Sequence, residues 1–331
     1  MPSVLTTIFG GLLAGSSATG LMLSVGQVAG MSGMLYGVLT QTPGDWIWKA
    51  VYTAGVAASA LMLKYAGLGA AAWNFAGPWS VIAASGFLVG FGVTLGNGCP
   101  SGHGICGLPR FSPRSFAAVG TFFSVAAVVA NVVGPDTSTV AILATAAAAT
   151  AVGVVVRLNQ SKNQPRIRVA PPPEQQVSSP VQLATVFVLA ALFGTGLIVG
   201  GMANPGTVKH FLKLDGEWDE SLFYFLTSAL ASSFIGFQMV KKQDKPALAC
   251  KHVLPTSSVI TPELVVGAAL FGIGWGLQGV CPGPAIIALA NMSESTVIYW
   301  AGLLVGMSTH YIVDEVGIDF GIRRALYLKK E

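Results

Sequence analysis

The composition of this chain is that of a membrane protein. Of its 331 residues, 53% are hydrophobic and only 10% are charged, whereas soluble domains usually carry about 25% charged residues. The formal net charge of +4 comes from basic residues at chain ends and between apolar stretches, a pattern of membrane topology and not of nucleic-acid binding. The sequence contains no phosphate-binding loop, nucleophile elbow or dinucleotide fingerprint. An ATP-driven transporter or an enzyme therefore finds no support.

Apolar stretches follow one another along the whole chain. They cover 3–40, 47–72, 80–108, 115–133, 137–157, 181–212, 219–240, 262–291 and 294–313. Backbone in lipid must satisfy its own hydrogen bonds, so we expect every stretch to be helical and the protein to be an all-α integral membrane protein. Several stretches exceed the ~20 residues that one span needs and contain Gly or Pro near their middle. This predicts broken or re-entrant helices.

One polar segment divides the chain. Residues 158–180 contain arginines and a run of three prolines at 171–173, a composition too polar for lipid and too rich in proline for a helix. We therefore expect a first membrane repeat at 1–157, a linker at 158–180 and a second membrane repeat at 181–331. The basic linker and C-terminal tail favour the cytosolic side of a bacterial inner membrane, or of a eukaryotic plasma or organellar membrane.

The same motif occurs once in each repeat. Residues 88–95 read Leu-Val-Gly-Phe-Gly-Val-Thr-Leu, and residues 270–277 read Leu-Phe-Gly-Ile-Gly-Trp-Gly-Leu. A Cys-Pro pair follows each copy, and 182 residues separate Cys99 from Cys281. A weaker match, 176 residues apart, relates a glycine-rich break around Gly30 to the Asn-Pro-Gly break at 204–206. Corresponding interruptions in two repeats indicate a transporter's binding site; the spacing leaves open whether the repeats are inverted or parallel.

Each Cys-Pro pair reads as the start of a half-helix. Proline is favoured at the first helical position, so each cysteine falls at the N-cap beside free backbone N–H groups. Two such starts would aim two thiols and two positive helix ends at one point, which suits a small anion. The candidate substrate-binding residues are Cys99, Cys281, Asn97, Gly98, Pro100, Gly279, Pro282 and Gly283. Second-tier candidates are Cys106, His103, Gly30, Ser32 and Asn204.

A metal site is the competing interpretation of the first break. Cys99, His103 and Cys106 are spaced at i, i+4 and i+7, and Cys281 offers a fourth ligand. The spacing is not a usual zinc or iron–sulfur pattern, so we expect neither a resident metal nor a cofactor. We place Cys250, in a polar loop, outside any site.

No carboxylate falls in the middle of an apolar stretch. Asp and Glu lie at the edges of the stretches, as Glu263 and Asp314 do, so the buried carboxylate relay of many pumps has no obvious candidate. Arg110 and Arg114 are expected to anchor a span at the membrane surface, and they could attract an anion. These features favour passive or weakly coupled transport.

The two cysteine segments resemble the signatures of the YeeE/YedE sulfur-transport family. The resemblance rests on Gly-Asn-Gly-Cys-Pro-Ser-Gly-His-Gly-Ile-Cys-Gly-Leu at 96–108, on Gly-Val-Cys-Pro-Gly-Pro-Ala at 279–285 and on the breaks at 26–33 and 196–205. It implies thiosulfate uptake by two fused halves related by pseudo-two-fold symmetry. It also implies that Cys99 and Cys281 hand the ion along through S–H hydrogen bonds.

One feature departs from that family, and it leaves alternatives open. The best-known members carry a further cysteine near the entrance, whereas the first segment here has no cysteine and only methionines, such as Met22 and Met31, as sulfur residues. The number of relay steps and the substrate are therefore open, and other sulfur or selenium species are alternatives. A second hypothesis is a membrane sulfur carrier that forms a persulfide on Cys99 or Cys281 and passes the sulfur to a cytosolic acceptor protein.

Overall fold

A computed structural model gives the fold of most of the chain. It describes residues 3–67, 75, 77–133, 138–163, 172, 175–213, 218–255 and 257–328, with side chains for all of these except 161–163 and 315–328. These ranges contain helices and no β-strand. The fold is therefore that of an all-α membrane protein, as predicted. Much of the linker, including the prolines at 171 and 173, lies outside the described residues.

The same order of elements occurs twice. The first series is α1 (Val4–Val25), α2 (Met31–Thr40), α3 (Trp46–Tyr65), α4 (Trp79–Leu95), η1 (Pro100–Gly107) with η2 (Leu108–Arg110), and α5 (Pro113–Val132). The second is α7 (Pro180–Val199), α8 (Pro205–Leu212), α9 (Ser221–Lys242), α10 (Pro262–Gln278), α11 (Pro282–Ala288) with η4 (Leu289–Asn291), and α12 (Glu294–Leu328). Helix α6 (Thr139–Asn163) stands between them and has no counterpart.

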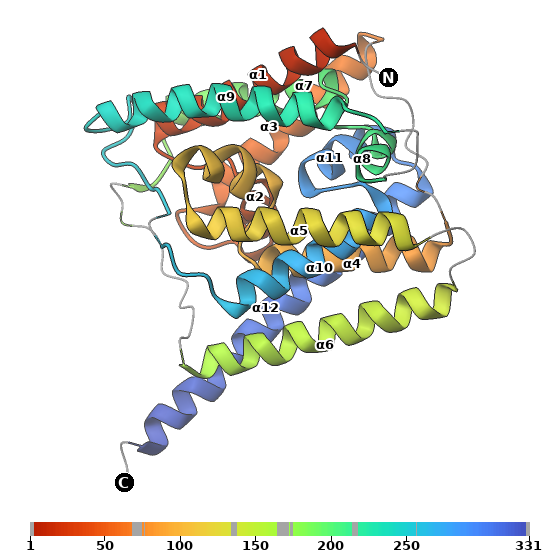
Figure 1. Ribbon diagram of the computed structural model, residues 1–331. Coiled ribbons are helices and arrows are strands. Elements are labelled where there is room, and N and C mark those ends of the chain that lie inside the picture. Colours follow the sequence, from red (N-terminus) through yellow and green to blue (C-terminus); the bar gives the residue numbers. More distant parts are fainter. Residues whose placement is uncertain are drawn as a thin grey trace.

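The long helices form two layers around the short ones (Figure 1). One layer contains α1, α3, α7 and α9, in which α1 packs on α7 and α9, and α3 packs on α7. The other contains α4, α5, α10 and α12, with α6 on its outer face against α12 and α4. The short helices α2, α8 and α11 lie between the layers. The segments that begin at the sequence breaks are therefore in the interior.

Corresponding helices of the two halves run in opposite directions. On α1, a Cβ at Gly10 would lie 2.4 Å from the Gly200 nitrogen of α7, and ten residues later a Cβ at Gly20 would lie 2.9 Å from the side chain of Leu189. As numbers rise along α1, the contacted numbers on α7 fall. A two-fold axis that relates two antiparallel helices must be perpendicular to both.

The pair α4 and α10 repeats this arrangement. A Cβ at Gly274 would lie 2.6 Å from the Ser85 carbonyl oxygen, whereas one at Gly92 would lie 2.8 Å from the Gly267 carbonyl oxygen. Glycines of the duplicated motif thus allow the close approach of two antiparallel backbones, as small residues do in membrane helix packing. The halves are inverted relative to each other, which resolves the alternative that the sequence left open.

Seven helices of the described residues are long and apolar enough to cross a membrane, or up to nine if each of two bent pairs is one span. The bent pairs are α4 with η1 and η2, at 47°, and α10 with α11 and η4, at 40°. These bends lie at the breaks that the sequence predicted. With the bent pair counted as one span, each repeat crosses four times (α1, α3, the bent pair and α5 in the first) and returns the chain to its starting side. The second copy is inverted only if one more crossing intervenes, and α6 supplies it.

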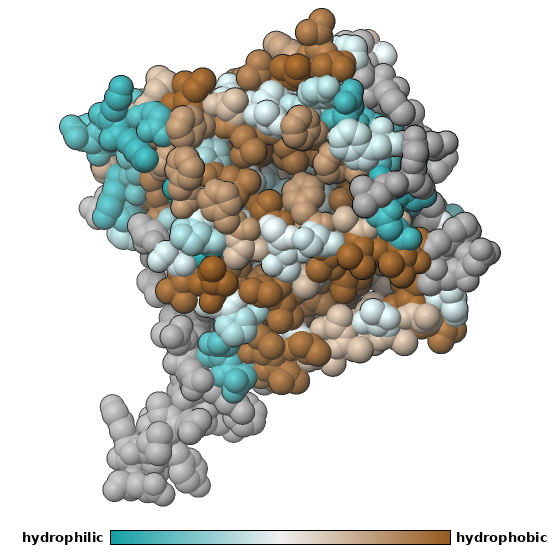
Figure 2. All heavy atoms as spheres, in the orientation of Figure 1, coloured by the Kyte–Doolittle hydropathy of each residue, from teal (hydrophilic) through white to brown (hydrophobic). Residues whose placement is uncertain are grey.

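The outer surface suits a lipid environment. Figure 2 shows broad hydrophobic areas over the helices and a hydrophilic cluster at the end of α9. Helix α6 is the most exposed span: only 11% of its apolar window is buried, and Val140, Val152 and Val155 are exposed. In water such a surface would be costly, so these side chains indicate contact with acyl chains.

A buried ion cluster corrects the expectation about carboxylates. Arg157 of α6 is 1% exposed, and its Nε lies 2.6 Å from Asp314 Oδ1 of α12. Its guanidinium also lies 3.6 Å from Glu263 Oε1 of α10. Both carboxylates are buried. They lie at the edges of apolar stretches in the sequence, but α6 packs across α10 and α12 and removes them from solvent.

Candidate functional site

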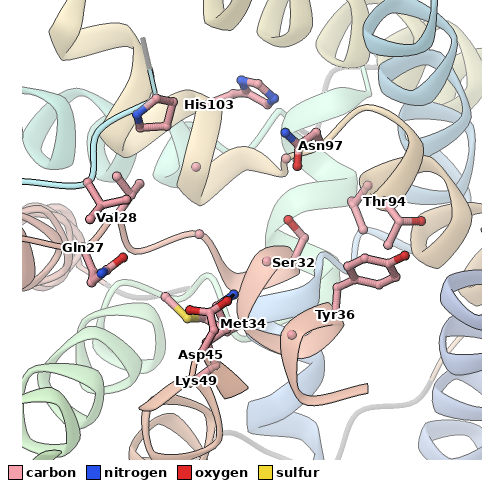
Figure 3. A pocket seen from close by; sticks show the side chains of 18 of the residues that line it. Gln27, Val28, Ser32, Met34, Tyr36, Asp45, Lys49, Thr94, Asn97 and His103 are labelled. Carbon is pink, nitrogen blue, oxygen red and sulfur yellow. Dashed lines mark hydrogen bonds and ion pairs between the residues drawn. The ribbon is translucent and has the colours of Figure 1, made fainter. Parts of the chain in front are cut away.

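A wide cavity of about 600 Å³ lies between the breaks of the first half. Five predicted residues line it, namely Gly30, Ser32, Asn97, Gly98 and His103. Figure 3 shows the side chains of Ser32 and Asn97 pointing toward each other across it. Its lining includes the charged residues Asp45, Lys49, Arg110, Arg114 and Asp314, and also His310. The cavity is thus polar and large enough for a hydrated ion.

A second, narrow cavity of about 50 Å³ contains both cysteines. Cys99, Pro100, Gly279, Cys281 and Gly283 of the predicted set line it. Pro282 is buried in the first turn of α11 but is not among the lining residues. A cavity of this size has room for only a few water-sized groups. The structure therefore brings the two Cys-Pro breaks, one from each half, together at one narrow cavity, which we call the constriction.

Two segments of the chain line both cavities, with different residues facing each one. In the segment 30–33, Met31 lines the narrow cavity, and residues 30, 32 and 33 line the wide one. In the segment 97–103, residues 99–101 line the narrow cavity, and residues 97, 98, 102 and 103 line the wide one. The wall between the two cavities is therefore one segment thick.

The Cys99 thiol lies in a polar network within this wall. It is 1% exposed and accepts a hydrogen bond from the Ser32 amide at 3.4 Å. It also lies 3.1 Å from the Ser101 hydroxyl, which in turn accepts from the Met31 amide at 3.1 Å. The N-terminus of α2 is thereby tied to the N-terminus of η1. Cys99 is the N-cap of η1, a wide π-type turn that begins with Pro100.

The Cys281 thiol lies in apolar surroundings. Cys281 is the N-cap of α11, and its residue is only partly buried. The position that matches Ser101 is Gly283, where an added Cβ would meet Leu197 Cδ1 at 3.2 Å and Met31 Cγ at 3.3 Å. Tyr299 of α12 anchors the segment just before α11, because its Oη donates a hydrogen bond to the Val280 carbonyl oxygen at 2.8 Å. The second thiol therefore has no serine hydroxyl at the position that matches Ser101, and the backbone beside it is anchored by Tyr299.

The residue that precedes each Cys-Pro pair by two positions has the same unusual backbone. Asn97 has φ 56° and Gly279 has φ 71°, both left-handed. Only the second site excludes a side chain, because a Cβ on Gly279 would lie 2.4 Å from the Pro205 carbonyl oxygen. The first copy tolerates asparagine, one of the residues that adopt this conformation most readily.

The geometry does not support the metal interpretation. His103 Nδ1 lies 3.2 Å from the Ser115 hydroxyl, and a Cβ on Gly98 would lie 2.3 Å from His103 Nε2. The Cys106 thiol donates to the Ala29 carbonyl at 3.8 Å and lines neither cavity. Among the described residues, no group of three His, Cys, Asp or Glu could hold a metal ion. The i, i+4 and i+7 spacing fails because η1 is not an α-helix.

The second-tier residues Gly30 and Asn204 are both N-caps, of α2 and α8. As N-caps of corresponding helices, Gly30 and Asn204 occupy equivalent positions. The sequence match at an offset of 176 residues paired Gly30 with Gly206 instead, so at this break it is wrong by two residues. Asn204 Oδ1 accepts from the Gly206 amide at 2.9 Å, and Asn204 lines neither cavity. Its role in the structure is that of a cap.

Sequence reasoning missed several lining residues of the narrow cavity. Ser101, Met31, Met202 and Trp275 all lie there. Met31 and Met202 add two thioethers to the two thiols, so sulfur lines the constriction from both halves. Ser101 could have been noticed as the polar residue two positions after Cys99. Trp275 stands where the two copies of the motif differ most in side-chain size, Val93 against Trp275.

Comparison with known proteins gives matches of two kinds. A family described as being of unknown function, DUF6691, matches residues 181–319. A "Probable transporter" of Xylella fastidiosa strain Temecula1 is 40% identical over 134 residues, which cover 40% of this chain and 90% of that protein. The corresponding protein of strain 9a5c is 42% identical over 134 residues, covering 39% of this chain and 91% of its own length.

A further protein of strain Temecula1, also named "Probable transporter", is 37% identical over 115 residues, which cover 35% of this chain and 84% of that protein. These relatives are each less than half as long as this chain, because the matched residues make up most of their length.

Proposed function

The chain belongs to the family of these Xylella probable transporters and is a membrane transporter, and we propose that it takes up thiosulfate or a closely related inorganic sulfur anion. The family of the relatives supplies the general activity. The sulfur substrate rests on the residues of the constriction and on the resemblance of its two segments to the YeeE/YedE signatures.

One observation carries this proposal: the thiols of Cys99 and Cys281 share one narrow cavity, each at the N-cap of a half-helix. Thiols donate weak hydrogen bonds, and a sulfur anion is a soft acceptor for them. The thioethers of Met31 and Met202 complete a polarisable lining. An anion that passes from the narrow cavity beyond the Cys99 wall would enter the wide cavity.

The arrangement of charge supports a cytosolic wide cavity. Val253, Pro255 and Ser257 line it and belong to the connection from α9 to α10, which follows Lys242 at the end of α9 and carries Lys245 and Lys251. Lys and Arg are in excess on cytosolic connections. Cys250 is exposed in the same connection. A membrane-impermeant maleimide should therefore label Cys250 in broken cells and not in intact ones, and labelling of intact cells would contradict this orientation.

The uptake of radiolabelled thiosulfate into proteoliposomes tests the transport proposal. Cys99→Ala and Cys281→Ala should each lower the uptake rate about tenfold or more, since a hydrogen bond to a charged group contributes about 1.5–3 kcal/mol. Cys250→Ala is the matched control and should leave uptake unchanged. Uptake at the wild-type rate by both cavity variants would overturn the cysteine pathway, whatever the substrate.

The same protein tests the sulfur-carrier alternative. After exposure to thiosulfate, a carrier should hold an additional sulfur atom on Cys99 or Cys281, because the cysteine thiolate would bond to the outer sulfur of thiosulfate while the S–S bond of the ion breaks and sulfite leaves. Intact-mass measurement detects the added sulfur. A transporter that only passes the ion should hold none. A stable adduct with no uptake would favour the carrier function.

A further inference from the structure

Trp275 brings a hydrogen-bond donor without an acceptor to the constriction. The indole is 3% exposed and lines the narrow cavity with Cys99 and Cys281. Its Nε1 is buried, and no residue of the described chain accepts a hydrogen bond from it. A buried donor left unpaired costs about 1–3 kcal/mol. Native structures rarely keep such a group without a reason, and a ligand that visits the cavity is one.

Three aromatic rings hold the indole in place. It stacks on Phe271 with an interplanar angle of 17° and a centroid distance of 5.8 Å. Phe122 and Phe123 meet it edge-on, at 5.9 Å and 5.1 Å. These contacts fix the ring plane before any ion arrives. A donor in a fixed orientation loses little entropy when it binds.

The duplicated motif makes this donor unique to one side. The matching position in the first copy, 182 residues earlier, is Val93, which lines the wide cavity. The other tryptophan near the site, Trp300, donates to the Ala285 carbonyl at 2.7 Å and lines neither cavity. The second copy of the motif therefore has an indole N–H at a position where the first copy has only an aliphatic side chain.

We infer that the indole N–H of Trp275 donates a hydrogen bond to an oxygen of the transported anion while the anion lies between Cys99 and Cys281. This inference rests on the proposed function and assigns Trp275 a role in specificity. An N–H donor prefers oxygen, whereas the thiols suit sulfur, so the two kinds of donor together fit an anion that has both atoms. Thiosulfate and sulfite meet this condition, and hydrosulfide, which has no oxygen, does not.

Indole ¹⁵N–H spectra of the wild-type protein in detergent test the contact directly. The chain has seven tryptophans, and the signal missing from Trp275→Phe belongs to Trp275. Thiosulfate should move that signal downfield, because an unbonded N–H becomes bonded. The Trp300 signal, identified with Trp300→Phe, should stay, because its N–H already has an acceptor. Trp275→Tyr provides the assignment if the phenylalanine variant does not fold.

Calorimetry and uptake separate this inference from the transport proposal. Trp275→Phe should weaken thiosulfate binding about tenfold and leave the ability of hydrosulfide to compete unchanged, whereas Trp300→Phe should do neither. Uptake by the wild type together with equal uptake by Trp275→Phe would overturn the donor role alone. A thiosulfate-dependent shift of Trp275 without uptake would overturn transport and support the donor. If the wild type binds neither thiosulfate nor sulfite, the donor role fails.

Discussion

The two Cys-Pro breaks share a backbone but not a chemistry. Each has a left-handed residue two positions before the cysteine, a cysteine N-cap and a proline at the first helical position. After Cys99 the chain continues with Ser101 and His103, whereas the matching positions after Cys281 are Gly283 and Ala285. The same backbone arrangement thus gives the constriction a polar face beside Cys99, where Ser101 lines it, and an apolar face beside Cys281, where Gly283 lines it. Symmetry determines where the thiols lie, and asymmetry determines what surrounds each one.

The largest structural difference between the halves is α6 with its buried Arg157. Arg157→Met should lower the free energy of unfolding by about 3–5 kcal/mol, because it leaves two buried carboxylates without their partner. Thermal unfolding in detergent measures this. The triple variant Arg157→Met, Glu263→Gln, Asp314→Asn should recover much of the loss. A single variant as stable as the wild type would show that the cluster contributes little to holding α6 on the bundle.

The left-handed residues should respond unequally to substitution. Gly279→Ala should cost about 2–5 kcal/mol, combining the strain of a left-handed alanine with the contact at the Pro205 carbonyl. Asn97→Gly should change stability by less than about 1 kcal/mol, because glycine adopts the same φ without a Cβ. Unfolding midpoints of the two variants measure the difference. Equal losses would mean that the two breaks are more alike than their contacts indicate.

The two cysteines should differ in what they contribute to folding. Cys99→Ala removes the acceptor of the Ser32 amide and should destabilise the protein by about 1–3 kcal/mol. Cys281→Ala loses a partly buried thiol beside a cavity and should cost less than about 1 kcal/mol. The same unfolding measurement serves for both. A larger loss for Cys281→Ala would reverse the assignment of the polar and apolar faces.

The smallest expected effect is a pH dependence that both halves share. A dianion that approaches thiolates is repelled, so uptake should weaken at a pH alkaline enough to remove the thiol protons. The sign follows from charge, because deprotonation adds negative charge to the path. The double variant Cys99→Ser, Cys281→Ser carries hydroxyls that do not titrate there. Its residual uptake should be independent of pH, and a variant that keeps the wild-type profile would place the titrating group elsewhere.

Local pattern was enough to predict the framework of the site. The Cys-Pro pairs, the breaks before them and the constant offset of 182 residues predicted two half-helix starts, and both cysteines line one cavity. These features depend on backbone rules that operate within a few residues. The fold class followed in the same way from hydropathy.

Features that depend on packing between distant segments could not be read from the sequence. Arg157 and Asp314 are 157 residues apart and lie at the edges of their apolar stretches, so nothing local shows that α6 buries them together. The π-type turn of η1 likewise removes His103 and Cys106 from the face that an α-helix would give them. Trp275 was present in the motif, but only the cavity shows that its N–H lacks an acceptor.

Helix α6 has a consequence for how such a protein can be encoded. Two separate chains, each the length of one Xylella relative, could insert in opposite orientations with no added helix. Once the two halves are joined in one chain, the second half must begin on the side of the membrane where the first half ends. A fusion through a purely soluble linker would place both copies the same way up and would leave each cysteine without its counterpart. The single unduplicated helix therefore makes the covalent joining of the halves compatible with a shared site.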